Sequence, residues 1–119
     1  LNNIKKANDT HGHSVGDQLI LNFARLLRNA VPSNDFVGRY GGDEFIAVIY
    51  NTTKDKVSDI LRQLDKKISE FNGLGKAFKI SYAHGCAFSS DYENCTLRTL
   101  FDKADKNMYN NKQAEKAGR

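Results

Sequence analysis

Apolar residues recur along this chain with two different periods. Over residues 14–30 they return every three or four positions, which is the spacing of one face of an α-helix. The same spacing appears over residues 54–71 and again after Thr96. The three apolar faces are Val15, Leu19, Phe23, Leu26 and Ala30; Val57, Ile60, Leu61, Leu64, Ile68 and Phe71; and Leu97, Leu100, Phe101, Ala104 and Met108. The pattern therefore predicts three helices.

Residues that start and stop helices stand at the ends of these stretches. Ser14 is expected to be the N-cap of the first helix, with Asp17 three residues further on as its capping-box partner. Thr96 can cap the last helix in the same way. The sequence VPSND (31–35) breaks the first helical pattern, and NGLG (72–75) ends the second.

Between the first two helices the pattern changes to that of a β-hairpin. Residues 36–40 and 45–50 read as two strands, and the second is an almost continuous apolar run, as expected of a strand buried on both faces. Residues 41–44 form the tip, where Gly41 and Gly42 are expected to supply positive φ angles and to let another group approach the backbone. Residues 78–88 alternate between apolar and other positions and predict a third strand.

The order of elements, helix, two strands, helix, strand and helix, predicts an α/β or α+β fold with helices packed on a mostly antiparallel sheet. Residues 1–13, LNNIKKANDTHGH, read as a loop and a short helix without a preceding strand. A length of 119 residues and 39% hydrophobic residues fit a single domain with a modest core.

Composition narrows the classes of function. No apolar run is long enough for a membrane span and no signal peptide is expected, so this segment should make no membrane contact. The net charge of +4 lies largely at positions 103–119 and on helix faces, and without an aromatic-interleaved motif we expect no nucleic-acid partner. Cys86 and Cys95 lack the spacing of metal ligands; a disulfide stays open, although a reduced, cytosolic setting is simpler.

Asp43 and Glu44 stand side by side at the mouth of a predicted strand. Adjacent carboxylates repel each other, and near apolar surroundings they need a compensating partner. The pair therefore indicates either a bound cation or a hairpin tip that is simply exposed to water.

Three blocks in register point to one family. They are NDTHGHSVGD (8–17), RYGGDEF (39–45) and ADKNMYNNK (104–112), and together they resemble the GGDEF domain of diguanylate cyclases over essentially the whole chain. The resemblance implies a nucleotidyl-cyclase palm, a ferredoxin-like sheet flanked by helices. The implied reaction joins two GTP molecules into cyclic di-GMP and releases two pyrophosphates, in bacterial second-messenger signalling.

The resemblance assigns the tip to catalysis and metal binding. It makes Asp43 a metal ligand and the candidate proton acceptor, with Glu44 as its acidic neighbour and Gly41 and Gly42 leaving room for the nucleotide. The metal is expected to be Mg²⁺, with Mn²⁺ as the alternative, because oxygen ligands and phosphate suit these ions. The backbone carbonyl of Leu1 would be an adjacent ligand.

The family's other metal-binding aspartate directly precedes the position of Leu1, at the end of the family's first strand. We therefore expect residues 1–119 to be one GGDEF domain truncated at its N-terminus and open to truncation at its C-terminus. We also expect this fragment to be almost inactive alone, because it would lack one carboxylate of the metal site.

The resemblance implies that the first block, residues 8–17, recognises the substrate. Asn8 and Asp17 match guanine-binding positions, since a carboxylate can accept from guanine N1–H and N2–H and an amide can donate to guanine acceptors. His13 matches a substrate-contacting histidine, and Lys5 matches a lysine that stabilises the transition state. The structural alternatives are that Asp17 only completes the capping box and that His13 only braces the loop.

The resemblance implies that the last block, residues 104–112, binds the triphosphate. Lys112 matches a lysine that reaches the phosphates. Four residues later the family often has an arginine where this chain has Lys116, which keeps the charge but loses the planar fork, so we assign no role to Lys116. Arg39 receives no catalytic role.

An inhibitory product site is not expected. Many members carry an Arg-x-x-Asp motif five residues before the tip, and the corresponding residues here are PSND, Pro32 to Asp35. Asp35 is retained, but proline offers neither the donors nor the charge of arginine. The segment is more simply a turn between helix and strand.

The resemblance also implies partners. Each domain would hold one GTP and act as a homodimer through facing active sites, with an upstream sensory or dimerising domain, in the cytoplasm or on a membrane-anchored parent protein. Two other functions stay open: a catalytically silent GGDEF module that binds GTP or a partner and regulates a neighbouring domain, and an unrelated ferredoxin-like binding domain.

Overall fold

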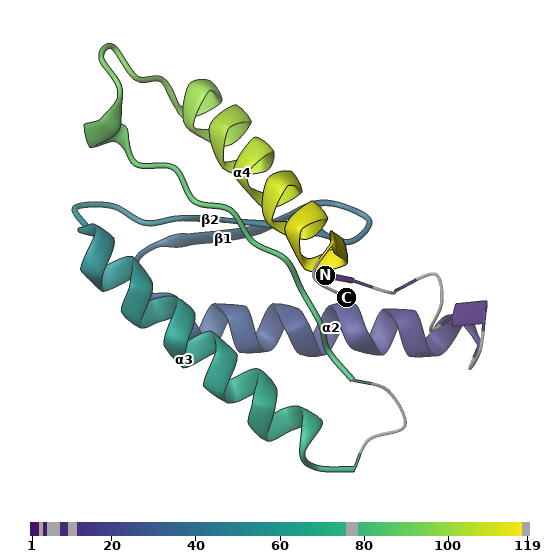
Figure 1. The fold of residues 1–119 in the computed structure, drawn as a ribbon. Helices are drawn as coiled ribbons and strands as arrows, with labels where there is room; N and C mark the ends of the chain where they lie inside the picture. Colours follow the sequence, from purple (N-terminus) through teal and green to yellow (C-terminus); the bar gives the residue numbers. More distant parts are fainter. Residues whose placement is uncertain (3, 5–7, 10–11, 76–78, 118–119) are drawn as a thin grey trace. The chain divides into compact units, whose positions relative to one another are not determined.

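The computed structural model describes residues 1–119 except 3, 5–7, 10–11, 76–78 and 118–119, and it does not describe the side chains of residues 13 and 114–117. Its elements are α2 (His13–Ala30), β1 (Phe36–Gly41), β2 (Glu44–Val48), α3 (Lys54–Asn72), the 3-10 helix η1 (Ser89–Asp91) and α4 (Leu97–Ala117) (Figure 1). They belong to two compact units, Leu1–Ser81 and Tyr82–Arg119, and each unit is described by itself.

The first two predicted helices are confirmed to within one residue at each end, and the last begins directly after Thr96 as predicted. The short helix expected near the start is represented by the described residues Ile4, Asn8 and Asp9, which are helical.

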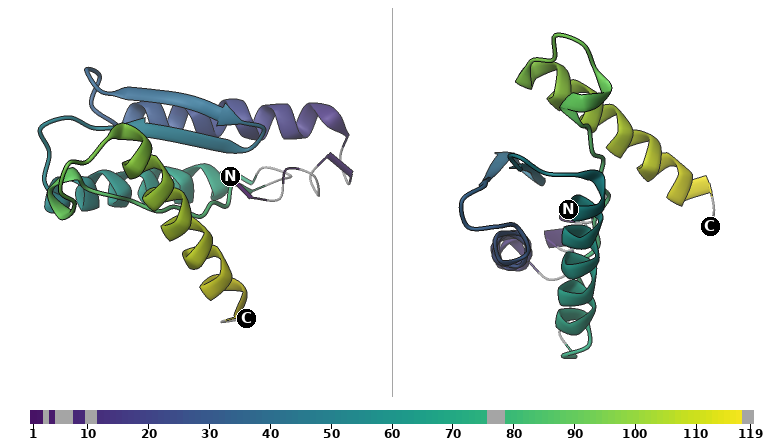
Figure 2. Two further views of the ribbon diagram at one scale, coloured as in Figure 1. Left: turned by 90° about the horizontal axis from the view of Figure 1, so that it is seen from above. Right: turned by 90° about the vertical axis from the view of Figure 1, so that its left-hand side faces the viewer.

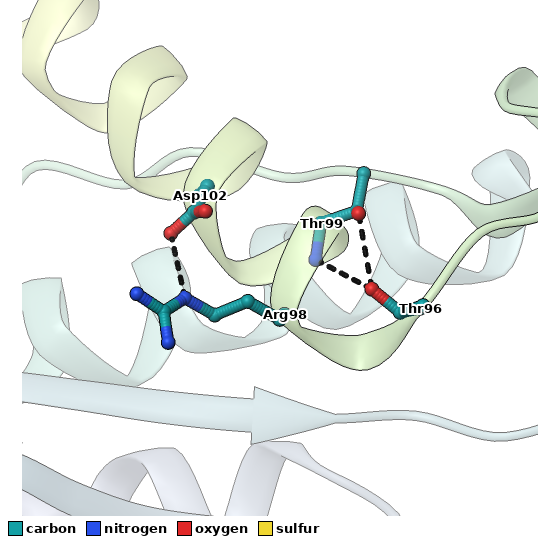
Figure 3. Close-up of polar contacts among 4 residues, drawn as sticks. All are labelled: Thr96, Arg98, Thr99 and Asp102. Carbon is teal, nitrogen blue, oxygen red and sulfur yellow. Dashed lines mark hydrogen bonds and ion pairs between the residues drawn. The ribbon is translucent and has the colours of Figure 1, made fainter.

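Thr53 caps α3, since its hydroxyl accepts a hydrogen bond from the nitrogen of Lys56 at 3.2 Å. Thr96 caps α4 as predicted: its hydroxyl oxygen accepts from the nitrogen of Thr99 at 3.1 Å (Figure 3). Beside it, Arg98 and Asp102 form an exposed ion pair one turn apart on α4.

The N-cap predicted for α2 is wrong. The helix begins at His13, so Ser14 lies inside it, and the N-cap is Gly12 with a φ of 96°. This positive φ lets the chain enter the helix two residues before a cap at Ser14 would, and it is readily available only to glycine. Asp17 therefore has no capping box to complete.

The hairpin between α2 and α3 is confirmed, with β1 and β2 paired antiparallel from Phe36 opposite Val48 to Arg39 opposite Phe45. The register then shifts, so that Gly41 lies opposite Glu44. The expectation of a second strand buried on both faces is wrong: β2 ends at Val48, and none of its residues is fully buried. In a two-stranded sheet both strands are edge strands, so neither is enclosed by neighbours.

The core of the first unit lies where α2 meets α3 and the hairpin. Phe23 on α2 packs its ring against the edge of Phe45 on β2, with ring centroids 5.1 Å apart. Figure 1 shows both helices on the same side of the hairpin. The buried apolar residues are Leu19, Phe23, Val31, Leu64, Ile68 and Ile80.

The third predicted strand is not formed in its described part, residues 79–88. A strand needs a neighbouring backbone to share its hydrogen bonds. Here the carbonyls of His84 and Cys86 instead accept from the side-chain amides of Asn111 and Asn107 on α4, at 2.8 and 2.9 Å. The fold class nevertheless agrees with the prediction of helices packed on an antiparallel sheet.

Cys86 and Cys95 are both free thiols. Within the described residues, none of the helices combines the length and apolar character that crossing a membrane requires.

Candidate functional site

The tip of the hairpin presents the two glycines and two carboxylates. Gly42 and Asp43 are exposed, and Gly41 and Glu44 are partly exposed. Arg39 folds back over this tip, with Nε donating to the carbonyl of Gly41 at 3.1 Å and Nη2 donating to the carbonyl of Gly42 at 2.7 Å. Sequence reasoning assigned Arg39 no catalytic role, and in the structure its guanidinium restrains the backbone immediately before Asp43.

The backbone itself does not require glycine at either tip position. Neither Gly41 nor Gly42 has a positive φ, so the expectation that they supply one is wrong. The chain reverses in the turn at Gly42 and Asp43, just after the shift of register between Arg39 and Gly41. A Cβ added at either glycine would meet no atom within 4 Å, so the space outside the tip is open, as expected of a place where another molecule approaches.

The structure brings the backbones of Leu1 and Asp43 together. The nitrogen of Leu1 donates to the carbonyl oxygen of Asp43 at 3.0 Å. On its other side, the nitrogen of Asn2 donates to the carbonyl of Ser81 at 2.7 Å. Because a trans peptide holds its C=O opposite to its N–H, the carbonyl of Leu1 faces away from Ser81.

This donor set fits a magnesium ion. A carboxylate and a backbone carbonyl are hard oxygen ligands, and Mg²⁺ commonly takes only one or two protein ligands and completes its shell with water and phosphate. The described residues contain no cluster of three or more histidine, cysteine, aspartate or glutamate side chains that could hold a metal. A metal here would therefore depend on oxygen atoms of the nucleotide as well as on the protein.

The two predicted guanine residues lie together at the start of α2. The side-chain oxygen of Asn8 accepts from the nitrogen of Gly16 at 2.8 Å, and Gly16 directly precedes Asp17. The backbone carbonyl of Asn8 accepts from the nitrogen of Gly12, also at 2.8 Å. These two bonds fix Asn8 to the first turn of the helix, while Asp17 is exposed.

A hollow of about 510 Å³ lies between α2 and the hairpin. Its lining includes Asp17, Ile20 and Leu21 from α2 and Val37, Arg39 and Phe45 from the hairpin. In both views of Figure 2 the hairpin lies along α2. Asp17 and Arg39 therefore border the same hollow, whose lining combines apolar side chains with one carboxylate, Asp17, and two arginines, Arg28 and Arg39.

The other predicted site residues lie outside the described part of the chain or in the second unit. Lys5 lies outside the described residues, and the side chain of His13 is not described, although its backbone begins α2. Lys112 lies in the second unit, on α4, next to Asn111, whose amide holds the carbonyl of His84. The side chain of Lys116 is likewise not described.

The segment from Pro32 to Asp35 is a turn that closes α2. The guanidinium of Arg28 donates to the carbonyls of Pro32 and Asp35, at 2.5 and 2.8 Å. The carboxylate of Asp35 accepts from the backbone nitrogen of Tyr50 at 3.2 Å. The role of Arg28 was not predicted from the sequence, although a basic residue in the last turn of a helix is a usual partner of helix-end carbonyls.

Burial raises the pKa of the Cys86 thiol, which disfavours its reactive thiolate form.

Residues 1–118 match the family described as diguanylate cyclase, GGDEF domain. The chain is 30% identical over 119 residues to diguanylate cyclase DgcS of Shewanella oneidensis, covering all of this chain and 38% of that protein. It is 38% identical over 120 residues to the signaling protein YkoW of Bacillus subtilis, covering 98% of this chain and 15% of that protein. The chain thus spans well under half the length of these relatives.

Solved structures show the same likeness. A sensory box/GGDEF family protein from Caulobacter crescentus superimposes with a TM-score of 0.75 at 31% identity, over 96% of this chain and 74% of that one. A structure from Pseudomonas aeruginosa comprising only a GGDEF domain gives a TM-score of 0.75 at 29% identity, over 95% of this chain and 67% of that one.

Proposed function

Because the chain belongs to the GGDEF domain family of diguanylate cyclases, we propose that it forms the domain that condenses two GTP molecules into cyclic di-GMP. Residues 1–119 act as one such domain in this proposal. The observation that carries it is the open tip at which the carboxylate-bearing Asp43 lies beside Leu1.

The reaction is a double transfer of a nucleotidyl group. The 3′-oxygen of one GTP forms a bond to the α-phosphorus of the other, and the bond from that phosphorus to the β-phosphate oxygen breaks, releasing pyrophosphate. A second, reciprocal transfer closes the ring. Transfer of this kind depends mainly on positioning and on neutralising the charge of the phosphates.

Asp43 takes the central role at the tip. Its carboxylate is exposed on the hairpin and can reach a substrate hydroxyl, whose proton it accepts. Asp43 and the carbonyl of Leu1 would hold Mg²⁺, with Mn²⁺ as a substitute, and Glu44 adds negative charge beside them. When bound, the metal supplies positive charge that offsets the negative charge of the triphosphate.

Recognition of guanine falls to Asn8 and Asp17. An exposed carboxylate that lines the hollow can accept from guanine N1–H and N2–H, while adenine presents no matching pair of donors. Discrimination by such a site is strong, because the wrong base leaves its polar groups unpaired. We further propose that Lys5 and Lys112 contact phosphates and that His13 contacts the substrate.

Two copies of the domain are needed in this proposal. The product contains two guanylyl units related by a two-fold axis, so a dimer with facing sites matches its symmetry. The relatives are two to several times longer than this chain, and one of them is named a signaling protein. A neighbouring sensory or dimerising domain would raise the local concentration of the two halves.

The proposed function is tested by identifying the reaction product. We expect the full-length protein, incubated with GTP and Mg²⁺, to form cyclic di-GMP and pyrophosphate, identified by chromatography and mass spectrometry. Formation of another nucleotide product would contradict the proposal. A protein that binds GTP at this site and forms no product would instead be a silent regulatory module.

A further inference from the structure

Gly16 is the one glycine inside a described helix, and it is buried against the side chain of Asn8. Its nitrogen donates to Oδ1 of Asn8 at 2.8 Å. A Cβ added at Gly16 would lie 2.2 Å from the same oxygen and 2.7 Å from Nδ2 of Asn8. The amide of Asn8 therefore occupies the space that any side chain at position 16 would need.

The chemistry of this contact fixes the orientation of the amide. A backbone N–H can only donate, so the amide atom that faces Gly16 must be the oxygen. The nitrogen Nδ2, with two donor hydrogens, is then on the other branch of the amide, and none of the hydrogen bonds of the described residues involves it. Turning the amide over would place Nδ2 against the N–H of Gly16, where two donors would meet, so this orientation is the favoured one.

We propose that Gly16 is a positioning residue for guanine specificity. By lacking a side chain and offering its N–H, it holds Asn8 with the oxygen toward the helix and the amide donors toward an acceptor on the base. Gly16 itself touches no nucleotide. The inference rests on the proposed function, in which Asn8 reads guanine.

Helix stability alone leads to the opposite expectation for this position. Glycine weakens the interior of a helix relative to alanine, so alanine at position 16 would be favoured by propensity. The added methyl group meets only the end of a flexible side chain, which can swing away. Gly16→Ala should therefore leave the fold at least nearly as stable while displacing the amide of Asn8.

The main experiment measures equilibrium binding of non-hydrolysable GTP and ATP analogues, with Mg²⁺, to the full-length protein. Gly16→Ala is expected to weaken binding of the guanine analogue by roughly three- to tenfold, the usual effect of one neutral hydrogen bond, and to leave the adenine analogue nearly unchanged. Gln18→Ala is the control, because Gln18 is exposed on the same helix and an alanine there leaves Asn8 untouched. An unchanged guanine-to-adenine ratio in a folded Gly16→Ala protein would overturn the inference.

Two further variants test the orientation, and the first of them does not depend on how Gly16→Ala folds. Asn8→Asp keeps an acceptor for the N–H of Gly16 but removes both donors, so it should lower the guanine-to-adenine ratio while preserving the melting temperature. In an Asn8→Ala background, Gly16→Ala should cause no further loss of guanine binding. An Asn8→Asp protein with wild-type selectivity, or an additive loss in the double variant, would refute the role of Gly16. A wild-type protein that binds no guanine nucleotide would refute the proposed function as well.

Discussion

The glycines of this chain differ in whether the backbone angle or the surrounding space requires a glycine. Gly12 has a φ of 96°, which few other residues adopt. A Cβ added at Gly85 would lie 2.1 Å from the nitrogen of Met108 and 2.2 Å from the carbonyl oxygen of Ala104, both backbone atoms of α4. Gly41 has neither constraint, and the space around it is open. This contrast separates glycines that serve the fold from one that is free to serve a ligand.

Substituting alanine at Gly41 and at Gly85 should have opposite consequences. Gly85→Ala forces α4 to move, so it should lower stability by about 1–3 kcal/mol, the typical cost of overpacking. Gly41→Ala should change stability by no more than about 0.5 kcal/mol, as surface substitutions usually do, yet slow cyclic di-GMP formation at least tenfold by crowding the nucleotide. Thermal unfolding and initial rates measured on both variants test this pair. A destabilised but fully active Gly41→Ala protein would show that its lack of a side chain serves the fold.

Asp17 offers a second test at the level of a single residue. Because the helix starts at His13 and Asp17 belongs to no capping box, Asp17→Ala should leave the melting temperature nearly unchanged. Binding of a GTP analogue should weaken by roughly tenfold or more, since hydrogen bonds to a charged group are the stronger ones, and the preference over ATP should narrow. Competition between GTP and ATP analogues measures both effects, with Glu70→Ala as the exposed acidic control. Equal competition at the wild-type site would remove Asp17 from guanine recognition.

At the scale of elements, the helices and the hairpin could be predicted because their signals are local. The helices and the hairpin between them can be placed from the apolar faces of residues 14–30 and 54–71 and from the break at Pro32. The strand predicted over residues 78–88 failed because pairing depends on a distant backbone, and Asn107 and Asn111 take its carbonyls instead. The side chains that organise the site, Arg39 on the tip and Asn8 on Gly16, form contacts that no spacing in the sequence encodes.

The turn after α2 carries a prediction about product feedback. Arg28 holds the carbonyls of this turn, and the carboxylate of Asp35 already accepts from the nitrogen of Tyr50. With Pro32 providing no charge, the turn lacks the arginine fork that phosphates bind. Calorimetric titration of cyclic di-GMP should therefore detect no tight site that depends on Asp35, and product should not inhibit noncompetitively. Tight binding abolished by Asp35→Ala would contradict this.

At the scale of the whole molecule, assembly should control the rate. The chain covers 38% and 15% of two relatives, so the domain works within longer proteins in those cases. If two facing copies form the product, the rate per subunit should rise with protein concentration until dimers predominate. Initial rates across a concentration series, compared with the mass measured by light scattering, test this expectation. A rate per subunit that stays constant through the monomer–dimer range would exclude catalysis between two copies.

The central claim is that the carboxylate of Asp43 at the hairpin tip drives the joining of two GTP molecules. One measurement tests this claim most directly. It is the rate of cyclic di-GMP formation by the full-length protein with Asp43→Asn, beside wild type and the exposed control Glu70→Gln, at saturating GTP and Mg²⁺. Asparagine keeps the size of the side chain but can neither accept the proton nor carry the charge that holds a metal. We predict a loss of about a hundredfold or more with an unchanged melting temperature, and no loss in the control. An Asp43→Asn protein that forms cyclic di-GMP at the wild-type rate would contradict the account.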